Sequence, residues 1–142
     1  NGLKILLNGV IMSSYKSDKI IVKKNGEDLF NTLTEFENLK NVLPPNIEKF
    51  EVKGETCVIK VANLPEIKLN IHEKISNKFV SYSASESPVP FLMKSFIEEI
   101  DNDSSYLIFE IDIELNLMTK MMLEKPIKSF INQISNAASK LS

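Results

Sequence analysis

Apolar residues recur with two different periods along the chain, and the change of period separates a helical part from a strand part. Residues 25–43 carry apolar side chains at the three- and four-residue spacing of amphipathic helices. Asn25 is a favourable N-cap for the first helix, and Pro44-Pro45 ends the second. We therefore predict two short helices, with a short strand before them within residues 18–24.

From Ile47 onward the apolar residues alternate with polar ones, which predicts antiparallel strands with one buried and one solvated face. Gly54-Glu55 has the form of a two-residue hairpin turn with glycine in the first central position. Turns at residues 63–65 and 76–77 keep the same apolar set on one face, whereas a slip of one residue would reverse a strand. The predicted cross-strand pairs are Val52–Cys57, Phe50–Ile59, Val61–Ile67, Ile59–Leu69, Cys57–Ile71, Ile71–Tyr82 and Leu69–Ala84.

The last third of the chain predicts two more strands and a long helix. Residues 91–100 form the first strand, in which Phe96 points away from the apolar face. Residues 107–117 alternate regularly, so one face of the second strand is buried and the other is wet. Residues 119–141 then carry an apolar stripe at helical spacing. Pro126 lies inside this stretch, so we expect a kink there or a short first helix before the main one.

Several short segments at defined places along the chain resemble a known superfamily. They are Asp28-Leu29-Phe30 with Leu33, residues 39–44, the loop Ser87-Pro88-Val89-Pro90-Phe91, and residues 121–130 with Lys125-Pro126. Together with the order of the predicted elements over residues 17–141, they make the chain similar to the SRPBCC superfamily of START and pollen-allergen-like proteins. Within it, the chain resembles the polyketide cyclase/dehydrase-like branch or an uncharacterised bacterial branch.

The resemblance implies an α+β helix-grip fold. In this fold a curved antiparallel sheet of about seven strands wraps around a long C-terminal helix, and two short helices lie between the first and second strands. Residues 12–142 would form this single domain. Residues 1–11 would be an N-terminal extension, vector-derived or upstream of a natural start at Met12, that adds a strand to a sheet edge or packs on a neighbour.

A curved sheet with one helix across its concave face cannot close everywhere, so a cavity is expected between them. Two outcomes stay open: a ligand-sized cavity on the order of 300–1,000 Å³, or an interior whose own large Phe, Met and Ile side chains fill it or leave only a very small cavity. Candidate lining residues are Leu39, Val42, Ile59, Leu69, Ile71, Tyr82, Met93, Ser95, Phe109, Ile111, Ile113, Phe130, Ile131 and Ile134.

Composition and charge exclude several kinds of partner and site. Seventeen basic residues, all of them Lys, and nineteen acidic residues give a net charge of −2. Without Arg, nucleic acid is not an expected partner. One Cys excludes an intramolecular disulfide and one His excludes a multi-histidine metal site, so neither a metal nor a cofactor is expected. No apolar run reaches the length of a membrane-spanning helix, so stable membrane insertion is not expected.

Few residues carry candidate chemistry, and we assign none as catalytic. His72 is turned outward by strand parity, and Cys57 is expected to be a buried, inert thiol without a histidine base. The carboxylates of residues 110–114 share the solvated face of their strand, where a metal or acid–base site is not expected. Tyr82 is the best inward-facing polar group and Ser95 the second.

The leading interpretation is non-enzymatic binding or carrying of a small hydrophobic ligand, lipid-like or polyketide-like. The resemblance also allows a cyclase/aromatase-like enzyme, for which Tyr82, Ser95 and Glu73 would be the acid–base candidates. A third alternative is a ligand-free interaction module, such as a homodimer, suggested by exposed Phe96 and the apolar tail around Leu6. Cytoplasmic residence is expected because no small-residue cleavage pattern follows the apolar start.

Overall fold

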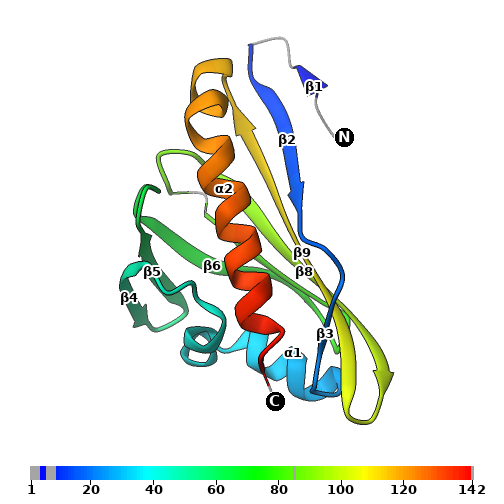
Figure 1. Ribbon diagram of the computed structural model, residues 1–142. Coiled ribbons are helices and arrows are strands. Elements are labelled where there is room, and N and C mark those ends of the chain that lie inside the picture. Colours follow the sequence, from blue (N-terminus) through cyan, green and yellow to red (C-terminus); the bar gives the residue numbers. More distant parts are fainter. Residues whose placement is uncertain (1–3, 6–8, 85, 142) are drawn as a thin grey trace.

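The computed structural model describes the backbone of residues 4–5 and all atoms of residues 9–84 and 86–141. Nine strands of one antiparallel sheet and three helical segments make up these residues (Figure 1). The elements in chain order are β1 (Lys4–Ile5), β2 (Ile11–Lys16), β3 (Ile20–Val22), α1 (Gly26–Thr34), the 3-10 helix η1 (Phe36–Val42), β4 (Ile47–Lys53), β5 (Thr56–Val61), β6 (Ile67–Ile75), β7 (Phe79–Ser83), β8 (Phe91–Asp101), β9 (Ser104–Leu115) and α2 (Leu117–Ala138).

The sheet runs in the order β1-β2-β9-β8-β7-β6-β5-β4, and β3 also pairs with β9. Because β2 and β3 both pair with β9, they are two parts of one interrupted strand. Ser17 bridges the interruption: its N–H donates to the carbonyl oxygen of Phe109, and its Oγ accepts from the Phe109 N–H, each at 2.8 Å. Counted in this way, the sheet has the expected seven strands plus β1 at its edge.

The first strand extends further toward the N-terminus than predicted. The prediction of residues 18–24 covers only β3, and β2 was missed. β1 pairs with β2 through Lys4↔Met12 and Ile5↔Ile11, so this segment does add a strand to a sheet edge. Leu6 and Leu7, which suggested an interaction surface, lie outside the described residues. The domain boundary at residue 12 stays a prediction.

The predicted hairpins form, and one register differs. Gly54 has a φ of 61°, as the β4–β5 turn requires, and Val52↔Cys57 and Phe50↔Ile59 pair as expected. Between β5 and β6 the pairs are Cys57↔Leu69 and Ile59↔Ile67. The predicted pairs Val61–Ile67, Ile59–Leu69 and Cys57–Ile71 are therefore wrong by two positions, because the connection is asymmetric: Ile67 pairs with Ile59, so residues 60–66 lie between the last paired positions. A shift of two preserves the buried face.

α1 begins where the sequence predicts, whereas α2 begins at Leu117, two residues before the predicted start, and β9 ends at Leu115 instead of at residue 117. Asn25 caps α1, with its Oδ1 accepting from the Asp28 N–H at 2.8 Å. Asn116 caps α2 in the same way, accepting from the Thr119 N–H at 2.8 Å. α2 continues through Pro126 as one helix, so the alternative of a separate short first helix is wrong.

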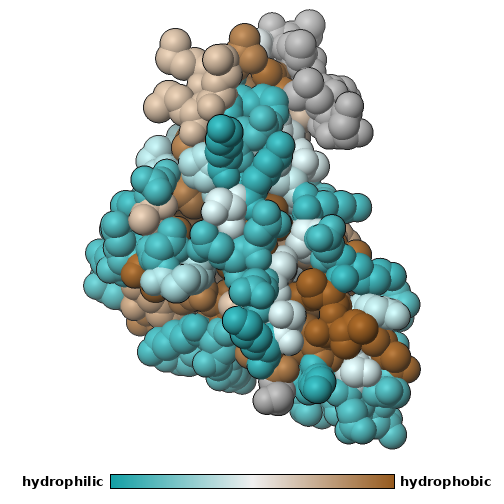
Figure 2. All heavy atoms as spheres, viewed as in Figure 1, coloured by the Kyte–Doolittle hydropathy of each residue, from teal (hydrophilic) through white to brown (hydrophobic). Residues whose placement is uncertain are grey.

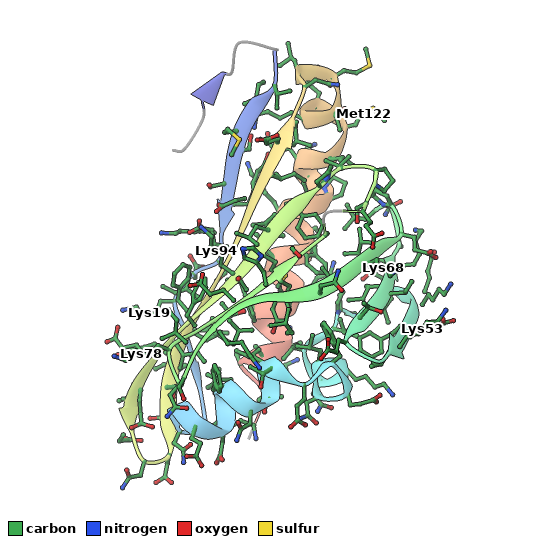
Figure 3. The ribbon with its side chains drawn as sticks, turned by 180° about the vertical axis from the view of Figure 1, so that it is seen from behind. Lys19, Lys53, Lys68, Lys78, Lys94 and Met122 are labelled. Atoms are coloured by element: carbon green, nitrogen blue, oxygen red, sulfur yellow. The ribbon has the colours of Figure 1, made fainter. Side chains whose placement is uncertain are left out.

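The two faces of the sheet differ in character. α2 lies along the inner face, and α1 and η1 cover its end near the C-terminus of α2 (Figure 1). The outer face carries polar side chains, and Lys94 stands over its centre (Figure 3). Lys94 is opposite Glu110 in register, and its Nζ reaches Asp112 Oδ2 diagonally at 2.6 Å.

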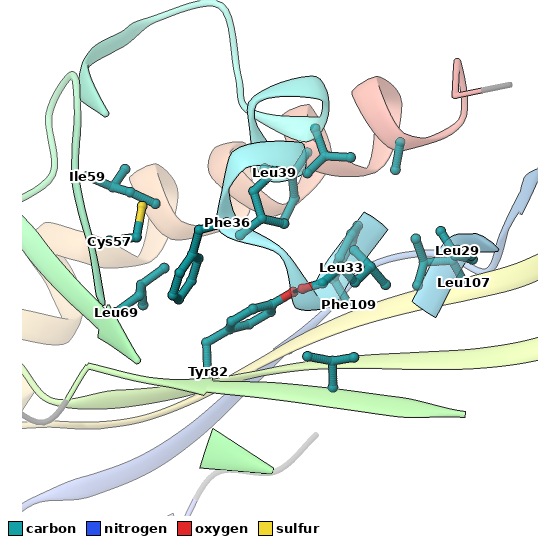
Figure 4. Close-up of a cluster of buried hydrophobic side chains, with 14 of the residues drawn as sticks. Leu29, Leu33, Phe36, Leu39, Cys57, Ile59, Leu69, Tyr82, Leu107 and Phe109 are labelled. Atoms are coloured by element: carbon teal, nitrogen blue, oxygen red, sulfur yellow. Dashed lines mark hydrogen bonds between the residues drawn. The ribbon is translucent and has the colours of Figure 1, made fainter. Parts of the chain in front are cut away.

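The inner face and the helices enclose the core. Figure 4 shows its main cluster, in which Phe36 and Leu39 of η1 approach Leu69 and Tyr82 of the sheet. A second cluster joins β2 and β9 to the first half of α2, with Tyr15, Ile111 and Ile131 among its members. Burying a Leu, Ile or Phe side chain contributes roughly 1.5–3 kcal/mol, so this inner face stabilises the fold.

Candidate functional site

Two small apolar chambers lie between the sheet and α2. The first has a volume of about 60 Å³ and lies beside the β5–β6 turn, the β7–β8 loop and the first half of α2. Its walls contain no polar side chain. The lining residues are Ile59, Val61, Leu64, Pro65, Ile67, Val89, Phe91, Ile111, Ile113, Leu123, Ile127 and Phe130.

The second chamber lies deeper, beneath α1 and η1, and has a volume of about 30 Å³. Tyr82 is the one polar side chain in its wall. The lining residues are Leu33, Leu39, Val42, Leu43, Ile59, Leu69, Tyr82, Met93, Phe109, Phe130 and Ile134. Ile59 and Phe130 line both chambers, so these two side chains form the partition between them.

The chambers match the second expected outcome, a filled interior or a very small cavity, and not a ligand-sized cavity. Each exceeds the roughly 10–15 Å³ that holds one water molecule, so the interior is not solidly filled. Neither reaches the on-the-order-of-300 Å³ lower bound of ordinary ligand pockets. A ligand larger than a few atoms must therefore displace side chains, and the shared partition is the place where displacement gains the most connected space.

Most predicted lining residues face these chambers. Three do not: Ile71 is half-buried just before a bulge in β6, Ser95 is fully buried beside the core, and Ile131 packs in the second cluster. Ten further residues line the chambers; four of them lie in connecting segments, where strand parity does not apply, and six lie in helices or strands. Those residues are Leu33, Leu43, Val61, Leu64, Pro65, Ile67, Val89, Phe91, Leu123 and Ile127.

The side chain of Tyr82 is held in place by burial and by a hydrogen bond to the backbone. Its hydroxyl donates a hydrogen bond to the carbonyl oxygen of Leu33 in the last turn of α1. The ring is almost fully buried, and burial raises the pKa of the phenol far above its ordinary value. Tyr82 is therefore not available at neutral pH as a base. Ser95 lies near this hydroxyl, but Glu73 is exposed, so the three acid–base candidates do not converge.

The other candidate groups lie apart from the chambers. His72 is exposed, as predicted. Cys57 is fully buried, and burial, with a smaller effect from the charge of Glu37, raises the pKa of its thiol to about 12. Glu110 and Asp112 stand with Lys94 on the outer face of the sheet.

One ionic cluster joins α2 to β2. Lys120 Nζ lies 2.5 Å from Glu124 Oε1, and the Tyr15 hydroxyl donates to the same oxygen at 3.2 Å. The hydrogen bond to Glu124 raises the pKa of Lys120, so the amine stays protonated and is not a nucleophile at neutral pH. The cluster fixes the first turns of α2 to the sheet.

The described residues contain no grouping of three His, Cys, Asp or Glu side chains that could hold a metal ion. No helix in the described part of the chain has the length and apolar character needed to cross a membrane.

The element order, the sheet topology and the chambers under the last helix agree with one architecture. The chain has the helix-grip fold. Helix-grip structures that align with it include a START superfamily protein from Mycobacterium smegmatis, at 14% identity and a TM-score of 0.65, over 92% of this chain and 99% of that one.

Two plant and bacterial enzymes have the same helix-grip fold. Norcoclaurine synthase from Thalictrum flavum aligns at 13% identity and a TM-score of 0.71, over 94% of this chain and 87% of that one. Zhui aromatase/cyclase from Streptomyces sp. R1128 aligns at 13% identity and a TM-score of 0.66, over 91% and 94% of the two chains. No protein-family model and no curated protein matches the sequence. At these identities the likeness concerns the helix-grip fold, which hosts both binding proteins and enzymes.

Proposed function

We propose that this protein binds and carries a small hydrophobic molecule, lipid-like or polyketide-like, between the sheet and α2. The observation that carries the proposal is the pair of apolar chambers separated by only two side chains, Ile59 and Phe130. A compact scaffold without a ligand would gain from filling such space, because empty apolar volume costs about 24 cal/mol per Å³. The helix-grip fold of the START superfamily protein supports the same proposal.

The expected affinity follows from the balance between burial of apolar ligand surface and the cost of association. Burying about 300 Å² of apolar ligand surface contributes roughly 7 kcal/mol, and association costs at least about 4 kcal/mol. The balance of roughly 3 kcal/mol corresponds to millimolar binding. Tighter binding requires either a larger buried surface, gained by moving the partition, or a polar contact for one end of the ligand.

The test uses a neutral lipophilic dye, N-phenyl-1-naphthylamine, whose fluorescence rises in an apolar site. We expect saturable binding by the wild-type protein. Leu123→Trp should reduce the binding several-fold, because Leu123 is a half-buried wall residue of the first chamber and the indole fills it. Ile75→Trp is the matched control, because Ile75 is 49% exposed on β6 and lines neither chamber.

Organic extraction of the purified protein, followed by mass spectrometry, provides an independent readout. A co-purifying apolar molecule at near-stoichiometric amount supports the proposal. Absence of dye binding together with an empty extract would reject it, and a ligand-free scaffold or interaction module would then be the better description.

An enzyme of the cyclase/aromatase kind is the less favoured alternative. It needs two or more acid–base groups aimed at one bound substrate, and the hydroxyl of Tyr82 is held by Leu33 while Glu73 is exposed. Cytoplasmic residence, a homodimer and the lack of nucleic-acid binding remain predictions of the sequence.

A further inference from the structure

Phe130 is the one side chain, among the described residues, that lines both apolar chambers and a third hollow on the surface. This polar hollow has a volume of about 250 Å³ and lies between α2 and the turn that joins β5 to β6. Its polar side chains are those of Asn46, Asn63, Lys125, Ser129 and Gln133.

The polar hollow and the first chamber are neighbours. Val61, Leu64 and Phe130 line both of them, just as Ile59 and Phe130 line both apolar chambers. Phe130 is half-buried and comes from α2, one turn after Pro126. A rotation of this ring would therefore move the one wall residue that the polar hollow and both apolar chambers share.

The charge of the polar hollow favours an anion. Lys125 supplies a cation, and no carboxylate lines the hollow. Lys125 is exposed and forms no ion pair with any residue that the structure describes, so its charge is not neutralised locally. An ammonium group of this kind is a ready partner for a carboxylate.

Gln133 adds an unused hydrogen-bonding group at the same place. Its Nε2 donates to Ser129 Oγ at 3.0 Å, while its Oε1 is buried without a partner. Turning the amide by half a revolution would let Oε1 accept from the Ser129 hydroxyl and would free Nε2 to donate to a ligand. When a hydrogen-bond acceptor occupies the hollow, both polar atoms of the Gln133 amide therefore have hydrogen-bond partners.

We propose that the ligand is a single-chain amphiphile with a carboxylate head. The head lies in the polar hollow beside Lys125 and Gln133, and the hydrocarbon chain passes Phe130 into the first and then the second chamber. Phe130 is the plug that separates head site from tail site in the free protein. This inference rests on the proposed function and specifies the ligand class of that site.

The shape of the interior restricts the tail. Chambers of about 60 and 30 Å³ joined past one side chain form a narrow path, which suits an unbranched chain better than a fused-ring skeleton. The walls offer no free polar group to a functionalised tail, because the Tyr82 hydroxyl is bound to Leu33. The protein would therefore distinguish ligands by their head group and by the width of their hydrocarbon chain.

The test compares dodecanoate with 1-dodecanol, which share a tail and differ in charge, by displacement of N-phenyl-1-naphthylamine. We expect the wild-type protein to bind dodecanoate about fivefold more tightly or better, which is roughly the contribution of one exposed ion pair. Lys125→Gln should abolish the preference. Lys128→Gln is the matched control, because Lys128 is an exposed lysine on the same helix outside the polar hollow.

The plug is tested separately. Phe130→Leu, which shortens the plug but keeps the position apolar, should tighten dodecanoate binding several-fold, and Phe130→Trp should weaken it. Should Phe130→Leu fail to fold, as judged by circular dichroism, the lysine pair still decides the position of the head.

Three results would overturn the inference. Equal binding of dodecanoate and dodecanol, or a preference unchanged in Lys125→Gln, shows that the head site is wrong while the proposed function stands. Unchanged affinity in both Phe130 variants shows that the ring is not the plug. If neither the dye nor dodecanoate binds wild-type protein or Phe130→Leu, the proposed function fails and this inference falls with it.

Discussion

The hydroxyl of Tyr82, on β7, donates its hydrogen bond to the carbonyl oxygen of Leu33, so a strand side chain satisfies the last turn of α1. Neither group has access to water, since both residues are almost fully buried. The contact joins residues 49 positions apart and seats α1 on the inner face of the sheet. It also removes the most plausible acid–base group from the second chamber.

Loss of this hydroxyl should destabilise the fold. Tyr82→Phe leaves the Leu33 carbonyl buried without a donor, and we expect the free energy of unfolding to fall by about 1–3 kcal/mol. Urea denaturation measures the change. Tyr106→Phe is the control, because the Tyr106 side chain is only half-buried, and it should change stability by less than about 0.5 kcal/mol. Equal free energies of unfolding for Tyr82→Phe and wild type would show that this hydrogen bond makes no net contribution to stability.

Cys57 should resist modification in the folded protein. It is fully buried, and its pKa of about 12, raised mainly by burial, keeps the thiolate fraction negligible near neutral pH. We expect Ellman's reagent to react with one thiol per chain in guanidinium chloride and with almost none in buffer. Stoichiometric reaction of the native protein within minutes would contradict this prediction and show that the core opens readily.

Asp112 should stabilise the fold at neutral pH more than at acid pH. Burial opposes its ionisation, but hydrogen bonds from the Lys94 amine and the Ser14 hydroxyl help to outweigh burial and hold its pKa below the ordinary value. Because the folded pKa is lower than the unfolded one, the stabilisation is complete above about pH 4 and is lost as the pH falls through the folded pKa.

Asp112→Asn should therefore lower the free energy of unfolding by roughly 1 kcal/mol at neutral pH and by much less near pH 2–3. Glu110→Gln is the matched control on the same strand face. Burial and the neighbouring Asp112 raise the pKa of Glu110, so ionised Glu110 opposes folding as the pH rises, and its removal should be neutral or stabilising at neutral pH. Urea curves at the two pH values distinguish these signs. An equal loss for Asp112→Asn at both pH values would contradict the linkage.

The first two turns of α2 expose a group of apolar side chains. Leu117, Met118, Met121 and Met122 are 63–78% exposed. They gather at the top of the molecule, where Figure 3 labels Met122 and Figure 2 shows hydrophobic residues at the surface. Exposed thioethers oxidise more readily than packed ones.

Dilute hydrogen peroxide should therefore oxidise three of the five methionines first. We expect Met118, Met121 and Met122 to form sulfoxides faster than Met12 and Met93, which are half-buried. Peptide mass spectrometry over a time course gives the order. Because the exposed side chains are not in the core, the melting temperature should stay nearly unchanged after their oxidation. Early oxidation of Met93 would contradict the placement of that residue in the wall of the second chamber.

Much of the fold was predictable because its signals are local. The N-cap at Asn25, the turn at Gly54 and the alternation along β9 each depend on a few neighbouring residues. The error of two positions between β5 and β6 arose at a five-residue connection without a defined turn type, where parity fixes the face but not the pairing. β2 was missed because Ser13 and Tyr15 make a weak apolar pattern there.

The division of the interior could not be read from the sequence. Strand parity indicated that Ile59 faces inward, and helical spacing indicated the same for Phe130. Whether they fill, line or divide a cavity depends on side-chain rotamers and on the rotation of α2 about its own axis. The polar hollow depends on Asn63 and its neighbours in a loop, where no periodicity applies. Contacts such as Tyr82 to Leu33 join distant segments and emerge only from packing.

The pairing of β2 with β9 has a consequence for how the chain folds. Ser14 and Asp112, which meet across these strands, are 98 residues apart. During synthesis β2 must wait, with the backbone donors and acceptors that will face β9 open, until β9 has been made. Completion of the sheet thus depends on a contact between segments far apart in the chain, and until β9 is in place one edge of β2 stays unpaired and open to other molecules.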